Sequence, residues 1–159
     1  GLVFGGGRVG LMGVLADRVV ERGGEVIGVI PEFLSRHEIA HPGLTELRVV
    51  ATMHERKALM AELADGFIAL PGGYGTLEEF FEIVTWAQLG LHRKPCGLLN
   101  IRGYFDPLLH QVEQAVGDGF VRIAHRPLII DDPTAGGLLN RMAAHTPPET
   151  VQILHPEEI

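Results

Sequence analysis

The chain has 159 residues and a formal net charge of −7 at pH 7, which argues against nucleic-acid binding as its main task, because that task favours basic surfaces. Cys96 is the only cysteine, so a disulfide framework and a thiolate metal cluster are excluded, and a reducing cytoplasm fits. No apolar run is long enough to span a membrane, and the length favours one domain with its own core.

Short apolar runs alternate with helical patterns, which predicts an α/β fold with a mostly parallel sheet and crossover helices on both faces. In chain order we expect strand Leu2–Phe4, helix Leu11–Arg22, strands Glu25–Ile30 and Leu47–Ala51, helix Met53–Ala64, strand Gly66–Leu70, helix Thr76–Leu89, strand Cys96–Ile101, helix Pro107–Val116, strand Leu128–Ile130 and helix Pro133–Ala144. The strand position of Cys96 predicts an inert, buried thiol. We expect one domain over 1–145 and a surface tail over 146–159. Because Gly1 is not methionine and a strand begins at once, we expect the natural start to lie upstream.

Two glycine loops each lie between an expected strand and an expected helix: Gly5-Gly6-Gly7 and Gly72-Gly73-x-Gly75. The first turn of a helix has N–H groups without a partner inside the helix and the positive end of the helix dipole. Glycines let the main chain curl around an anion with no Cβ in the way. Both loops would lie at the carboxyl ends of strands, so together they indicate a phosphorylated ligand, although plain turns would also explain them.

The segment Gly5-x-Gly7-x-x-Gly10 matches the dinucleotide fingerprint, and Glu32 lies about where the ribose-binding acid would follow. We reject this match, because the chain has no room for a second catalytic domain and the second glycine loop would stay unexplained. Neither loop is followed by Gly-Lys-Ser/Thr, which excludes a nucleoside-triphosphate P-loop.

Thr76 and Glu79 lie directly behind the second loop and allow two interpretations. With Thr76 at the N-cap, Glu79 would reach back as the acidic member of a capping box. Alternatively, the Glu79 carboxylate faces the ligand, where it could stabilise a developing positive charge or activate a water molecule. The spacing alone leaves both open.

Arg56 falls on the same face of its expected helix as Met53, Met60 and Leu63. A guanidinium on such a face is costly unless its stem snorkels to solvent or the group meets an anion. A carboxylate, a ligand phosphate or a ribose edge would serve, since arginine suits planar bidentate contacts.

Three motifs combine into a specific pattern: Gly5-Gly6-Gly7 with Gly10-Leu11-Met12-Gly13, Met53-His54-x-Arg56-Lys57, and Pro71-Gly72-Gly73-x-Gly75-Thr76-x-x-Glu79. Together they resemble the Lonely Guy family of cytokinin riboside 5′-monophosphate phosphoribohydrolases, which are often mislabelled lysine decarboxylases. The likeness runs from Gly1 to about Ala144. Family members begin with another strand and a small-residue loop ahead of this chain's first residue, so an N-terminal strand–helix unit is expected to be missing here.

The resemblance implies a Rossmann-like, doubly wound fold, a homodimer or homohexamer, and an N-glycosyl hydrolase without cofactor or metal. Its partner would be a nucleoside 5′-monophosphate, N6-prenylated AMP or AMP itself, cleaved to free base and ribose 5-phosphate. The catalytic residues would be Arg56 and Glu79. The substrate-binding residues would be Gly6, Gly7, Met53, Lys57, Gly72, Gly73, Gly75 and Thr76.

The alternative function is a non-catalytic carrier of the same fold that binds a nucleotide or the molybdenum cofactor. Such a carrier would need the phosphate loop but not the pair of Arg56 and Glu79, and the sequence has both.

Two further matches are rejected. The run His37-Glu38-Ile39-Ala40-His41 fits the zinc-protease signature, but Pro42-Gly43 follows at once, so we expect a solvated loop. A pyridoxal-dependent decarboxylase needs a Schiff-base lysine, and neither Lys57 nor Lys94 is placed for one.

Overall fold

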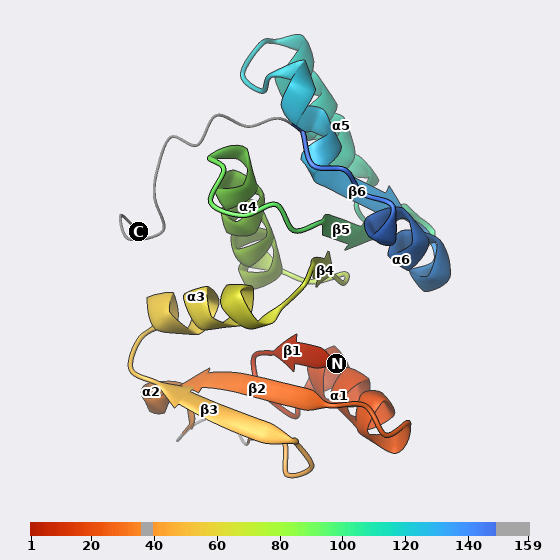
Figure 1. Cartoon of the computed structure of the whole chain (residues 1–159). Helices are drawn as coiled ribbons and strands as arrows, with labels where there is room; N and C mark the ends of the chain where they lie inside the picture. The colour runs from red at the N-terminus through yellow and green to blue at the C-terminus, as the bar shows by residue number, and fades with distance from the viewer. Residues whose placement is uncertain (36–39, 149–159) are drawn as a thin grey trace. The chain divides into compact units, whose positions relative to one another are not determined.

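The computed structural model describes residues 1–35 and 40–148 and divides the chain into two compact units, Gly1–Ala64 and a second unit from Asp65 onward. The strands are β1 (Leu2–Phe4), β2 (Val26–Pro31), β3 (Glu46–Val50), β4 (Phe67–Ala69), β5 (Cys96–Leu99) and β6 (Ile129–Asp132). The helices are α1 (Gly10–Glu21), α2 (Glu32–Ser35), α3 (Met53–Leu63), α4 (Tyr74–Gln88), α5 (Asp106–Gly117) and α6 (Ala135–Ala143), with short 3-10 helices at Ile101–Gly103 and Ile123–Leu128 (Figure 1).

The first unit is a three-stranded parallel sheet in the order β1-β2-β3. Helix α1 packs against β1 and β2, and α3 packs against all three strands. A core cluster of Phe4, Ala16 and Val26 joins α1 to the sheet, because the apolar side chains of both elements point between them. This packing fixes the ends of β1 and β2. The first glycine loop follows β1, and Arg56 binds main-chain carbonyl oxygens of this loop and of β2.

The second unit is another parallel sheet, in the order β4-β5-β6. Every residue of β5 is buried, as the continuous apolar run predicts for a central parallel strand. Helix α6 packs against β5 and β6 through a core of Leu99, Ile130, Leu138 and Met142. Helix α4 contacts β4 and β5, so the segment after β4 is held by the sheet at both of its ends.

The α/β class with parallel strands is confirmed, and the two strand orders are those of the two halves of a Rossmann-like fold. The expected boundaries differ by a few residues, and helix α2 has no counterpart among the expected elements. The difference that matters most for the site is the start of α4, which lies at Tyr74 and not at Thr76. The division at 145 and 146 stays a prediction, since residues 149–159 lie outside the described part of the chain.

The predicted burial of Cys96 is confirmed, because the residue is 1% exposed and burial raises the pKa of its thiol to about 12. A thiol that stays protonated at neutral pH is a poor nucleophile and metal ligand, so the predicted inertness follows.

In the described ranges, no helix combines the length and the apolar character needed to cross a membrane.

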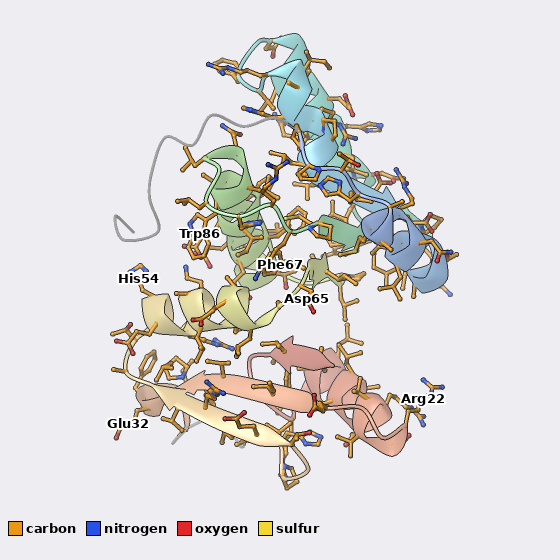
Figure 2. All side chains as sticks on the ribbon, in the orientation of Figure 1. Arg22, Glu32, His54, Asp65, Phe67 and Trp86 are labelled. Atoms are coloured by element: carbon orange, nitrogen blue, oxygen red, sulfur yellow. The ribbon has the colours of Figure 1, made fainter. Side chains whose placement is uncertain are left out.

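His92 links the end of α4 to the chain that enters β5, and its ring nitrogens face two main-chain groups. Nε2 lies 2.9 Å from the carbonyl oxygen of Ile83, and the main-chain N–H of Lys94 donates to Nδ1 over 3.1 Å. The ring also contacts Phe67 of β4, which is labelled in Figure 2, edge to face. This arrangement suits the neutral imidazole, with the proton on Nε2, because Nδ1 must accept a hydrogen bond.

We expect the protein to lose stability between pH 8 and pH 5.5 through His92. Burial lowers the pKa of His92 in the folded state, and nearby Lys94 lowers it further. As the pH falls, the unfolded chain, with a pKa of about 6.5, is therefore protonated first. The stabilisation is complete above about pH 6.5 and is lost as the pH falls through the folded-state pKa. Melting temperatures across this range should fall less for His92→Phe than for the wild type; an equal fall in both would contradict the assignment.

Candidate functional site

The second glycine loop leaves β4 and turns directly into α4. Gly73 is the N-cap of α4, with an extended conformation (φ −93°, ψ −151°), and the main-chain N–H of Leu77 donates to its carbonyl oxygen over 3.2 Å. No side chain caps this end, and the first turn holds no acidic residue. The helix itself therefore does not neutralise the positive end of its dipole.

The capping box, one of the two interpretations left open for Thr76 and Glu79, is wrong, because Gly73 and not Thr76 is the N-cap of α4. Thr76 is the third residue of α4, one turn away from Glu79 on the same side of the helix. The helix starts earlier because Gly73 takes the cap conformation. Thr76 and Glu79 are half-buried, on the side of α4 that also carries the buried Phe80. Glu79 is thus not the acidic member of a capping box at this end of α4, and its role as a ligand-facing carboxylate stays a prediction.

A contact within the chain explains why residue 72 is glycine. A Cβ at this position would overlap the hydroxyl of Thr76, so the two residues are fitted to each other. The carbonyl oxygen of Gly72 also accepts a hydrogen bond of 2.7 Å from the hydroxyl of Tyr104. Sequence reasoning missed Tyr104, because 32 positions separate it from Gly72 and no local pattern links the two.

Gly73 and Gly75 differ from Gly72, because no side-chain contact requires glycine at either position, although glycine at 73 suits the N-cap. Both are exposed, and a Cβ on either would meet no atom of the surrounding structure within 4 Å. The φ of Gly73 is one that any residue adopts, and a glycine inside a helix costs about 0.5–1 kcal/mol relative to alanine. At position 75 the fold alone would thus favour a side chain, whereas bare main chain at a helix start suits an external anion.

Arg56 is the fourth residue of α3, is buried, and is held by the main chain of the first unit. Its residue is 9% exposed, its Nε donates to the carbonyl oxygen of Val29 over 3.1 Å, and its Nη2 donates to that of Gly5 over 3.2 Å. The snorkelling alternative is therefore wrong. The guanidinium instead joins the carboxyl end of β2 to the residue that follows β1, while Nη1 lies 3.9 Å from the sulfur of Met53.

Internal contacts account for the glycines of the first loop. A Cβ on Gly5 would overlap Nη2 of Arg56, and Gly6 has a φ of +79°, which L side chains rarely adopt. The carbonyl of Gly6 accepts from the N–H of His41 over 3.0 Å, and Gly7 forms an isolated bridge with Ala40. All three glycines are buried. Roles of Gly6, Gly7, Met53 and Lys57 in binding a ligand stay predictions.

Replacing Gly5 with alanine should destabilise the protein by about 1–3 kcal/mol, because the new methyl group must displace the Arg56 guanidinium from a packed site. The check is urea unfolding of Gly5→Ala, Arg56→Ala and the double variant. The penalty of Gly5→Ala should shrink once Arg56 is alanine, since the displaced group is gone. Strictly additive penalties would show that Gly5 is not fitted to Arg56.

The zinc-protease match loses its remaining support where the structure describes it. Residues 37–39 lie outside the described ranges. His41 is buried, with Nε2 2.9 Å from Oδ1 of Asp17 and Nδ1 accepting from the N–H of Gly43 over 3.1 Å. Both ring nitrogens are therefore occupied. Over residues 1–35 and 40–148, no three histidine, cysteine or acidic side chains gather as a metal site.

Comparisons with known proteins identify the family of the chain. The model of the family described as "Possible lysine decarboxylase" matches residues 12–142. The chain is 61% identical over 130 residues to a cytokinin riboside 5′-monophosphate phosphoribohydrolase of Rhodococcoides fascians, covering 81% of this chain and 66% of that protein. It is 48% identical over 158 residues to the enzyme of that name called LOG in Oryza sativa subsp. japonica, covering 99% of this chain and 65% of the relative.

A third relative, the cytokinin riboside 5′-monophosphate phosphoribohydrolase LOG4 of Arabidopsis thaliana, is 51% identical over 146 residues, which cover 92% of this chain and 68% of the relative. The chain spans slightly less than two thirds of the length of the first two relatives. The family match over most of the chain and these identities lead to one conclusion: the chain belongs to the Lonely Guy family, whose model bears the lysine decarboxylase description.

Proposed function

We propose that the chain hydrolyses the N-glycosidic bond of a nucleoside 5′-monophosphate, an N6-prenylated AMP or AMP, to the free base and ribose 5-phosphate. The observation that carries this proposal is Gly75, which follows the N-cap Gly73 and presents bare main chain at the start of α4 without a contact inside the chain that requires glycine. An N–H-rich helix start with an uncompensated dipole suits a 5′-phosphate. The names of the relatives support the same substrate class.

Glu79 would act one helical turn beyond Thr76, where the sugar follows the phosphate. Cleavage passes through an oxocarbenium-like ribose, which a carboxylate stabilises electrostatically. As the bond between C1′ and the base nitrogen breaks, the oxygen of a water bonds to C1′ and its proton passes to Glu79. The leaving base takes up a proton from solvent, and Glu79 then returns its proton to solvent. Phosphate binding would supply the energy that positions the ribose.

Arg56 is proposed as the second catalytic residue. Two of its nitrogens already donate to main-chain carbonyls, and these contacts fix the plane and position of the guanidinium. Nη1, whose neighbour at 3.9 Å is the Met53 sulfur, is the group we assign to the substrate.

The deciding experiment is a product assay on the purified chain with AMP, isopentenyl-AMP and the unphosphorylated riboside. We expect free base and ribose 5-phosphate from one or both nucleotides, and at least about a tenfold lower kcat/KM for the riboside, because the phosphate anchor is absent. Tight nucleotide binding without base release would favour the carrier function. Light scattering on the same sample tests the proposed homodimer or homohexamer, and the cytoplasmic location stays a prediction.

A further inference from the structure

We propose that the loop after β5, residues 100–106, is a brace that sets the position of the glycine loop and hence the affinity for the 5′-phosphate, with Tyr104 as its positioning residue; this rests on the proposed function. The contact that carries it is the hydrogen bond of 2.7 Å from the Tyr104 hydroxyl to the carbonyl oxygen of Gly72. Gly72 directly precedes the N-cap of α4, so this bond acts on the main chain that would cradle the phosphate.

The brace is itself held in one conformation by a buried amide. Asn100 is 8% exposed; its Oδ1 accepts from the N–H of Phe105 over 2.7 Å, and its Nδ2 donates to Oδ1 of Asp106 over 2.8 Å. Both ends of the Asn100 side chain are therefore used to close the turn. Phe105, 1% exposed, anchors the turn in the interior.

The main chain of the brace is strained in a way that fixes its shape. Arg102 has a φ of 55°, and Gly103 has a φ of 71° at a site where a Cβ would overlap the Asp106 carboxylate. A non-glycine residue in the left-handed region persists only where its surroundings hold it there. The Tyr104 ring meets Phe105 edge to face at 5.0 Å, so the direction of the phenol is also set.

The hydroxyl is the part of Tyr104 that reaches the glycine loop, and the residue is 51% exposed. Water can therefore replace the lost donor in Tyr104→Phe, and the fold should keep its stability. What changes is the freedom of the Gly72 carbonyl and of the loop that follows. A loop that must be ordered on binding lowers affinity for the group it binds.

The test is Tyr104→Phe, which keeps the ring and removes only the hydroxyl. Titration calorimetry with ribose 5-phosphate, which has no base to release, should show roughly a three- to tenfold weaker affinity, the loss typical of one neutral hydrogen bond. In steady-state assays KM for the nucleotide should rise by the same factor, with kcat within about twofold. The melting temperature should shift by no more than about 2 °C.

Two further variants make the result specific. Tyr74→Phe removes the same hydroxyl from the other tyrosine, which is 94% exposed, and serves as a control for stability alone: its melting temperature should match that of the wild type. Asn100→Ala frees the brace, so adding Tyr104→Phe to it should weaken binding by less than Tyr104→Phe does alone. Unchanged affinity of Tyr104→Phe for ribose 5-phosphate overturns the brace, whatever the activity. If the wild type releases no base while Tyr104→Phe still binds ribose 5-phosphate more weakly, the proposed reaction is refuted and the brace is not.

Discussion

Glu79→Gln is expected to lower the rate of base release by about 10²- to 10⁴-fold, the range for losing a positioned acid–base group. The amide keeps the size of the side chain but removes the charge that would stabilise the oxocarbenium-like ribose and accept the proton of water. Affinity for ribose 5-phosphate should change by less than about threefold, since the phosphate is proposed to bind at the loop before Thr76. Release of free base followed by chromatography gives the rate, and calorimetry gives the affinity.

The matched control for this prediction is Glu78→Gln. Glu78 precedes Glu79 on α4, is exposed, and loses the same charge in the variant. Its turnover should stay within about twofold of the wild type, because exposed charges are screened by solvent. Turnover like that of the wild type in Glu79→Gln, or an equal loss in both variants, would remove Glu79 from the reaction.

Most of the secondary structure could be predicted, because the apolar runs and the helical spacing are local signals. β1 matches its expected range, and α3 differs from its expected range by one residue at its end. The four-residue α2 was missed because such a short helix has no full period to detect. The parallel pairing followed from the alternation of strands and helices, and the strand orders within each unit then fit the Rossmann-like expectation.

The T-x-x-E spacing shows why local signals do not decide function. It occurs at Thr52–Glu55 as well as at Thr76–Glu79. At α3 the first pair caps the helix: Oγ1 of Thr52 accepts from the N–H of Glu55 over 3.1 Å, and Oε2 of Glu55 accepts from that of Ala51 over 2.8 Å. At α4 the N-cap is Gly73, so Thr76 and Glu79 do not cap that helix. The same spacing of threonine and glutamate thus has a capping role at α3 and no capping role at α4.

The contacts that tune the candidate site were not predictable, because each joins residues far apart in the chain. Gly5 is fitted to Arg56 across 51 positions, and Gly72 is held by Tyr104 across 32. A motif marks such glycines as special but does not say whether a partner within the chain or a ligand outside it requires them. The structure separates these cases: Gly5 and Gly72 face internal groups, whereas Gly73 and Gly75 face open space.

Gly75→Ala should therefore change stability and activity in opposite directions. Gly75 is the second residue of α4 and a Cβ there meets nothing within 4 Å, so alanine should stabilise the fold by about 0.5–1 kcal/mol through its better helix propensity. The same methyl group would stand beside the main chain proposed to receive the phosphate. Affinity for ribose 5-phosphate and kcat/KM for the nucleotide should each fall by about tenfold or more.

Gly136 supplies a matched control, because it is the second residue of α6, is exposed, and also has open space where its Cβ would stand. Gly136→Ala should give the same gain in urea unfolding with no change in affinity or turnover. A fold that merely tolerates glycine at position 75 predicts identical behaviour for the two variants. Only a ligand that approaches the start of α4 predicts that they diverge, so equal activities in Gly75→Ala and Gly136→Ala would refute the phosphate loop.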